Sequence, residues 1–104
     1  DALEIIDVSD LRYPELIKSY PMQSPYGLGI DGNTLFVCEG QNGLKIYNAT
    51  IPTNISLVKH YTGVHAYDVI PNQGVLIMTG NDGIAQYDYS NLSQIEQLSF
   101  IPVN

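Results

Sequence analysis

Short apolar runs alternate with polar turn segments along nearly the whole chain. The runs hold about 4 to 6 residues and are rich in Ile, Val, Leu and Tyr, the side chains that suit a pleated sheet. Between them stand "DGN", "QNG", "NQG" and "NDG", and Gly and Asn adopt positive φ at little cost. No stretch keeps a period of 3.6 residues. The pattern predicts an all-β protein.

One short sequence motif occurs three times along this pattern. It reads "LEIID" from Leu3, "LKIYN" from Leu44 and "IAQYD" from Ile84, so the starts lie 41 and then 40 residues apart. The shorter second unit is predicted to lose its residue in the turn at Gly32 and Asn33, because turns tolerate deletions better than strands. A unit of about 40 residues with four strand-like runs has the size of one propeller blade.

The repeat therefore predicts β-propeller blades, each a four-stranded antiparallel sheet. Residues 1–24 would form a half blade of two outer strands, and 25–64 and 65–104 one blade each, which gives a partial propeller of about two and a half blades. A β-sandwich is the rival architecture, but it does not require a repeat of this length. Propellers close with at least about four blades, so we expect a piece of a longer protein or a chain that assembles with further copies.

The stretch 3–20, "LEIIDVSDLRYPELIKSY", resembles the LVIVD repeat of bacterial and archaeal β-propeller proteins. The matching positions are Ile5, Asp7, Val8, Ser9, Asp10, Pro14 and Leu16. The second unit departs from the motif with "NATIPTN", and the third lacks the proline. The resemblance implies that "YGLGI" and "AYDVI" are innermost strands beside the propeller axis. It also implies an exported protein, cell-surface (for example a lipoprotein) or periplasmic.

Asp7, Asn48 and Asp88 follow apolar runs at corresponding places in the three units. A short side-chain acceptor at the end of a strand can bind the backbone N–H groups of the next turn. The hydroxyl residues two positions later can take part in the same turns. The repetition favours a structural role for these side chains.

The charge balance excludes several classes of partner. The net charge is −7, from 11 acidic and 4 basic residues, whereas nucleic-acid binding needs Lys and Arg to neutralise phosphates. A basic membrane-surface helix is excluded for the same reason. No apolar run approaches the roughly 20 residues that a membrane-spanning helix needs. The single cysteine, Cys38, is predicted to be a small apolar side chain in a buried strand.

Candidate site residues gather at the start of the predicted inner strands. His65 and Asp68 stand three residues apart in "HAYD", and Tyr26 and Tyr67 occupy equivalent positions. The tyrosines could present aromatic faces to a ligand in the channel or lie between blades, and we expect the second, a core position. His60 is predicted to lie on the surface. No metal or cofactor is expected, because a metal site needs three or four convergent ligands.

Two functions of different classes remain open. The first is a non-catalytic scaffold or binding module whose rim loops or channel contact a protein or glycan, with the rest of the parent propeller or further copies closing the ring. The second is a hydrolase-like or lyase-like enzyme with His65 and Asp68 in the axial channel. The enzyme requires that these two side chains converge in one pocket.

Overall fold

The structure of the protein is a computed structural model. It describes residues 2–7, 9–10, 12–22, 25–92 and 94–102. These residues form ten strands and no helix, which confirms the all-β prediction, and none could cross a membrane as a helix. The strands are β1 Ala2–Asp7, β2 Glu15–Pro21, β3 Gly27–Asp31, β4 Thr34–Cys38, β5 Leu44–Asn48, β6 Ser56–Tyr61, β7 Asp68–Asn72, β8 Val75–Thr79, β9 Gly83–Asp88 and β10 Glu96–Pro102.

The strands form three antiparallel sheets that follow one another along the chain. The first is the pair β1–β2, and the two others are four-stranded meanders in the orders β3-β4-β5-β6 and β7-β8-β9-β10. Each strand therefore pairs with its neighbour in sequence. This arrangement needs only short connections, which the Gly- and Asn-rich turns supply.

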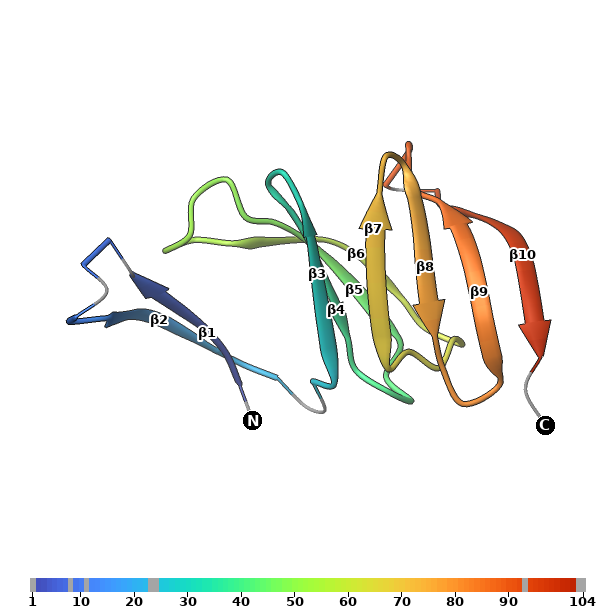
Figure 1. The fold of residues 1–104 in the computed structure, drawn as a ribbon, viewed down its shortest axis with the longest axis horizontal. Coiled ribbons are helices and arrows are strands. Elements are labelled where there is room, and N and C mark those ends of the chain that lie inside the picture. The colour runs from blue at the N-terminus through green and yellow to red at the C-terminus, as the bar shows by residue number, and fades with distance from the viewer. Residues whose placement is uncertain (1, 8, 11, 23–24, 93, 103–104) are drawn as a thin grey trace.

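The three sheets stand in a row from the N-terminus to the C-terminus (Figure 1). The described chain measures 44 × 26 × 22 Å, and its radius of gyration is 14.3 Å. A compact domain of this length has a radius of gyration near 13 Å, so the molecule is elongated along the row. Each sheet packs chiefly against the next one rather than around a single centre.

Two hydrophobic clusters fill the spaces between consecutive sheets. The cluster between the β1–β2 pair and β3–β6 contains Leu3, Met22, Leu35, Val37 and Ile55. The cluster between the two meanders contains Phe36, Cys38, Leu44, Ile46, Ala66, Val69, Leu76, Met78 and Tyr89. Strand β4 contributes alternate residues to both clusters and is buried on both faces, as a continuous apolar run predicts.

Strands β3 and β7 approach closely because β3 carries glycines. A Cβ added to Gly27 would lie 2.6 Å from the carbonyl oxygen of Tyr67, and one added to Gly29 would lie 2.6 Å from Cδ of Pro71. A larger residue at either position would force the two sheets apart. The "YGLGI" run is thus suited to contact between strands of neighbouring sheets.

The outermost strand of every sheet carries the same irregularity. The register shifts opposite Ile5/Ile6 in the first sheet, opposite Ile46/Tyr47 in the second, and at Gln97/Ser99 in the third. One residue of the outer strand is unpaired at each place, as in a β-bulge. Bulges of this kind increase the local twist of a sheet.

Two tyrosines at equivalent positions tie each sheet to the next one. The Tyr20 hydroxyl on β2 accepts the Ile55 N–H at 3.0 Å, within the loop between β5 and β6. The Tyr61 hydroxyl on β6 accepts the Ile95 N–H at 3.1 Å and donates to the Leu92 carbonyl at 2.9 Å, within the loop between β9 and β10. Both tyrosines therefore satisfy backbone groups of the following sheet.

The structure corrects the position of the one-residue gap between the units. Residues 32–33 and 73–74 each form a two-residue turn, because Asp31 pairs with Thr34 and Asn72 with Val75. The prediction that the turn at 32–33 is longer is wrong. Residues 39–42 precede Gly43 in the first meander, but only 80–82 precede Gly83 in the second. A Cβ on either glycine would lie 2.1 Å from a carbonyl oxygen of the outer strand, so the two glycines are equivalent.

The predicted turn acceptors are confirmed at two of the three positions. The Asn48 Oδ1 accepts the Thr50 N–H at 2.9 Å, and the Asp88 Oδ1 accepts the Ser90 N–H at 2.9 Å. The hydrogen bonds from Ser90 lower the pKa of Asp88 below its usual value. The Asp7 side chain lies outside the described part of the chain, and so does Val8 of the LVIVD-like motif.

Candidate functional site

Tyr26 and Tyr67 occupy equivalent positions just before β3 and β7. The Tyr26 N–H donates to the Cys38 carbonyl at 2.8 Å, and the Tyr67 N–H donates to the Thr79 carbonyl at 2.8 Å. Each bond extends a hairpin by one residue beyond its inner strand. Because β3 and β7 lie side by side, the two tyrosines meet at one end of the sheets.

Three rings form a row at this end. The centroids of Tyr26 and Tyr67 are 5.0 Å apart with an interplanar angle of 71°, and those of His65 and Tyr67 are 4.5 Å apart at 79°. Both are edge-to-face contacts, the geometry that the ring quadrupoles favour. The row is the central feature of the candidate site.

The predicted core position of the tyrosines is wrong. Tyr26 is 63% exposed and Tyr67 is 38% exposed, whereas buried side chains of the nearby cluster are almost inaccessible. The row lies at the rim of the interface between the meanders, beyond the cluster that fills it. Its ring surfaces therefore face solvent.

Beside the row lies a hollow of about 330 Å³, lined by Tyr26, His65 and the amide side chains Gln41 and Asn42. The amides come from the loop between β4 and β5. Within the described residues, this lining contains no lysine, arginine or carboxylate. Amide groups both donate and accept hydrogen bonds, so the hollow offers neutral polar contacts next to aromatic surface.

Backbone contacts hold the loop that carries the amides. Gly40 forms an antiparallel bridge with Ala66, with N–H···O distances of 2.7 and 3.0 Å. A Cβ on Gly40 would lie 2.5 Å from Cε2 of Tyr26, so the tyrosine ring lies directly over this glycine. The His60 Nε2–H donates to the Asn42 carbonyl at 2.5 Å. His60 is thus partly exposed on β6, and its hydrogen bond positions the loop.

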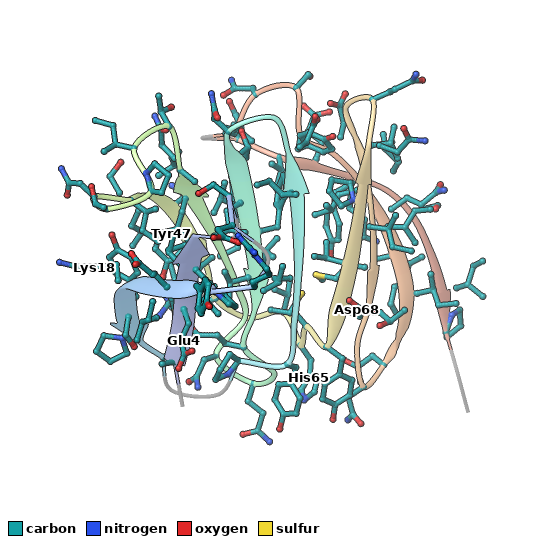
Figure 2. All side chains as sticks on the ribbon, turned by 60° about the vertical axis from the view of Figure 1, so that its left-hand side comes forward. Glu4, Lys18, Tyr47, His65 and Asp68 are labelled. Carbon is teal, nitrogen blue, oxygen red and sulfur yellow. The ribbon has the colours of Figure 1, made fainter. Side chains whose placement is uncertain are left out.

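His65 and Asp68 accept hydrogen bonds from different backbone N–H groups. The Nδ1 atom of His65 accepts the Asn81 N–H at 3.2 Å, and the Asp68 Oδ1 accepts the Val69 N–H at 2.9 Å. Figure 2 shows both residues at the same end of the sheets, with His65 nearer the rim. The Asp68 carboxylate also lies 2.7 Å from the place of a Cβ on Gly27, between the inner strands. The structure brings His65 to the two tyrosines and leaves Asp68 beside them.

Cys38 lies behind the site, in the core. Burial, with a smaller contribution from the nearby Asp68 carboxylate, raises the pKa of its thiol to about 12. A thiol held in its neutral form is a poor nucleophile. The prediction of a buried, apolar cysteine is confirmed.

Metal-binding geometry is absent from the described residues, among which no three His, Cys, Asp or Glu side chains cluster. Asp31 accepts the Tyr89 hydroxyl at 2.6 Å, and so links the turn after β3 to the end of β9. The site around Tyr26 and Tyr67 therefore offers aromatic and amide contacts rather than a set of metal ligands.

Sequence reasoning missed the two amides and the role of His60. "QNG" indicates a turn by its composition, and nothing in it shows that the turn faces the tyrosine row. The sequence signal for this loop is its length, one residue more than in the second unit. The prediction placed that extra residue in the turn at 32–33, so the longer loop was not recognised.

Comparisons with protein-family models, curated proteins and solved structures found no match to this chain. The resemblance to the LVIVD repeat stays a prediction from the motif, and the function has to be argued from the geometry of the site.

Proposed function

We propose that this chain is a run of β-propeller blades within a larger exported protein, and that it serves as a non-catalytic binding module. The β1–β2 pair would be the outer half of one blade, and the two meanders would be complete blades. The aromatic row at the rim would bind a partner, which the chemistry of the lining favours as a glycan over a charged peptide. The location at the cell surface or in the periplasm follows from the LVIVD resemblance.

The packing of the meanders supports the blade arrangement. Their first strands, β3 and β7, lie against one another, and the later strands spread away from that contact in sequence order (Figure 1). The bulge and the tyrosine contacts recur from sheet to sheet. A further blade would cover the outer face of β7–β10 as this meander covers the preceding one.

The observation that carries the binding function is the row of Tyr26, Tyr67 and His65, whose two tyrosines are exposed, beside a hollow lined by Gln41 and Asn42. Sugar rings present apolar C–H faces and a rim of hydroxyls. Aromatic side chains can cover the first, and amides can pair with the second. A charged ligand would find no lysine or arginine in this lining.

The enzyme alternative is less well supported. It needs an acid–base pair, but His65 and Asp68 each bind a backbone N–H group. Among the described residues, the one thiol is buried with a raised pKa. No observation assigns a nucleophile to the rim, so the binding function is preferred.

The test measures binding to a printed array of neutral oligosaccharides. The wild-type chain should bind a subset, and Tyr26→Ala should weaken that binding about three- to tenfold, since an aromatic contact contributes about 0.5–1.5 kcal/mol. Tyr13→Ala is the matched control, because Tyr13 is 72% exposed in the turn before β2, away from the row.

Two results would contradict the binding function. One is the absence of any bound oligosaccharide at array concentrations at which known lectins respond. The other is equal binding by Tyr26→Ala and the wild type, which would place the contact elsewhere on the chain.

A further inference from the structure

A buried ion pair distinguishes the first meander from the second. The Glu39 side chain is completely buried, and its Oε2 atom lies 2.8 Å from Nζ of Lys45, which is 20% exposed. A buried charge needs its partner, because removing an ion from water is costly. Lys45 pairs with Val37, which belongs to the cluster between this meander and the β1–β2 pair.

The place of Lys45 is taken by Ala85 in the second meander. Lys45 pairs with Val37 on the neighbouring strand, and Ala85 pairs with Met78. Val37 and Met78 both point toward the preceding sheet, one in each cluster. The two positions are therefore equivalent, and the second one lacks the long side chain.

The position of Glu39 is occupied by a glycine, Gly80, in the second meander. The Glu39 N–H donates to the Gly43 carbonyl at 2.9 Å, and the Gly80 N–H donates to the Gly83 carbonyl at 3.0 Å. Gly80 cannot carry a larger residue, since a Cβ there would lie 1.9 Å from the His65 carbonyl oxygen. Both members of the ion pair are thus absent from the second meander.

A hollow of about 150 Å³ lies at this place. Its lining includes Gly80, Ala85, Val64, Met78, Phe100 and Asp82. An engineered cavity of about this volume holds benzene, so an alkyl chain of four carbons fits. The hollow replaces the volume that Lys45 fills in the first meander.

We propose that this hollow binds a primary alkylammonium group, supplied by a free amine or by the lysine side chain of a partner. Val64, Met78, Ala85 and Phe100 in its lining supply apolar surface for the methylene groups. The ionisable side chains of the lining are Asp82, His65 and Tyr87, with no lysine or arginine. The net charge of −7 also favours a cation. The site is separate from the amide-lined hollow, although His65 borders both.

The experiment is an NMR titration of the whole chain with n-butylammonium chloride, with n-butanol as the neutral isostere. We expect saturable shifts of the backbone amides of Val64, Met78 and Ala85, and at least about tenfold weaker binding of butanol. Asp82→Asn should raise the Kd about two- to fivefold, as for a partly exposed ion pair. Glu96→Gln removes the same charge from β10 outside the hollow and should leave the Kd unchanged.

Two further variants fill the hollow. Ala85→Lys restores the residue of the first meander, and Ala85→Met fills the volume without charge, so both should abolish the saturable shifts. Shifts that persist in either folded variant would overturn the proposal, as would equal binding of butanol and butylammonium.

The source of the amine is distinguished by a second ligand, Nα-acetyl-lysine amide. Binding as tight as that of butylammonium would assign the site to lysine side chains of a partner. Binding of butylammonium alone would assign it to free amines. A failure of both to bind would end the proposal.

Discussion

At the scale of single residues, two ion pairs of the described chain differ in their exposure to water. Glu39 is completely buried and its partner Lys45 is 20% exposed, whereas Arg12 and Asp10 form a pair whose side chains are 83% and 51% exposed. The surrounding water screens the exposed pair, and the buried pair has lost that water. The two pairs should therefore respond very differently to the loss of one partner.

Lys45→Met should lower the free energy of unfolding by about 3–5 kcal/mol, because it leaves the Glu39 carboxylate buried without its partner cation. The double variant Glu39→Met/Lys45→Met should recover most of this loss, since no buried charge remains. Urea unfolding followed by circular dichroism measures both.

Arg12→Met serves as the exposed control and should have no measurable effect. A loss of similar size in the single and double variants would show that packing by the lysine chain, not charge, accounts for the effect.

At the scale of elements, the connection of one sheet to the next depends on tyrosine hydroxyls as well as apolar contact. Tyr20 and Tyr61 lie near the ends of the outer strands of consecutive sheets, and each binds a loop of the following sheet. The backbone groups that they bind lie between strands, where no ladder partner is available. A hydroxyl is therefore needed at both places.

Tyr61→Phe should lower the free energy of unfolding by about 1–2 kcal/mol, because the part-buried Ile95 N–H and Leu92 carbonyl lose their partner. Tyr20→Phe should behave alike through the Ile55 N–H. Tyr13→Phe, at an exposed turn position, is the control. Thermal unfolding measures the three variants, and an unchanged midpoint for Tyr61→Phe would contradict the role of the hydroxyl.

At the scale of the whole molecule, the last meander presents an uncovered apolar face. Its exposed apolar side chains are Ile70, Ile77, Ile84 and Ile101, on the face opposite the cluster between the meanders. In the preceding meander this face, with Phe36 and Ile46, is buried by its neighbour. A bare sheet face of this kind promotes association.

The isolated chain should therefore self-associate, with an average mass that rises with concentration in sedimentation equilibrium. Ile77→Lys, at the centre of the face, should shift the chain toward the monomer. Ile51→Lys is the control, because it adds the same charge at a loop residue that is 57% exposed. This variant should associate as the wild type does. A wild-type chain that is monomeric at every concentration would contradict both the association and the need for a covering blade.

Strands and turns could be predicted from the sequence because their signals are local. Short apolar runs between Gly- and Asn-rich turns indicated the strands, and the acceptors Asn48 and Asp88 act on residues only two positions away. The local pattern could not say which side of a strand is covered, and the predicted core position of the tyrosines failed for that reason.

The tertiary structure alone decided what depends on contacts between sheets. The strand register placed the extra residue in the loop of Gln41 and Asn42, and so brought two amides to the aromatic row. It also paired Glu39 with Lys45 and left their equivalents, Gly80 and Ala85, around a hollow. The sequence by itself determined the fold class, because backbone pairing follows from local pattern. The sites were decided by packing, because side chains from separate strands meet only when the sheets are in place.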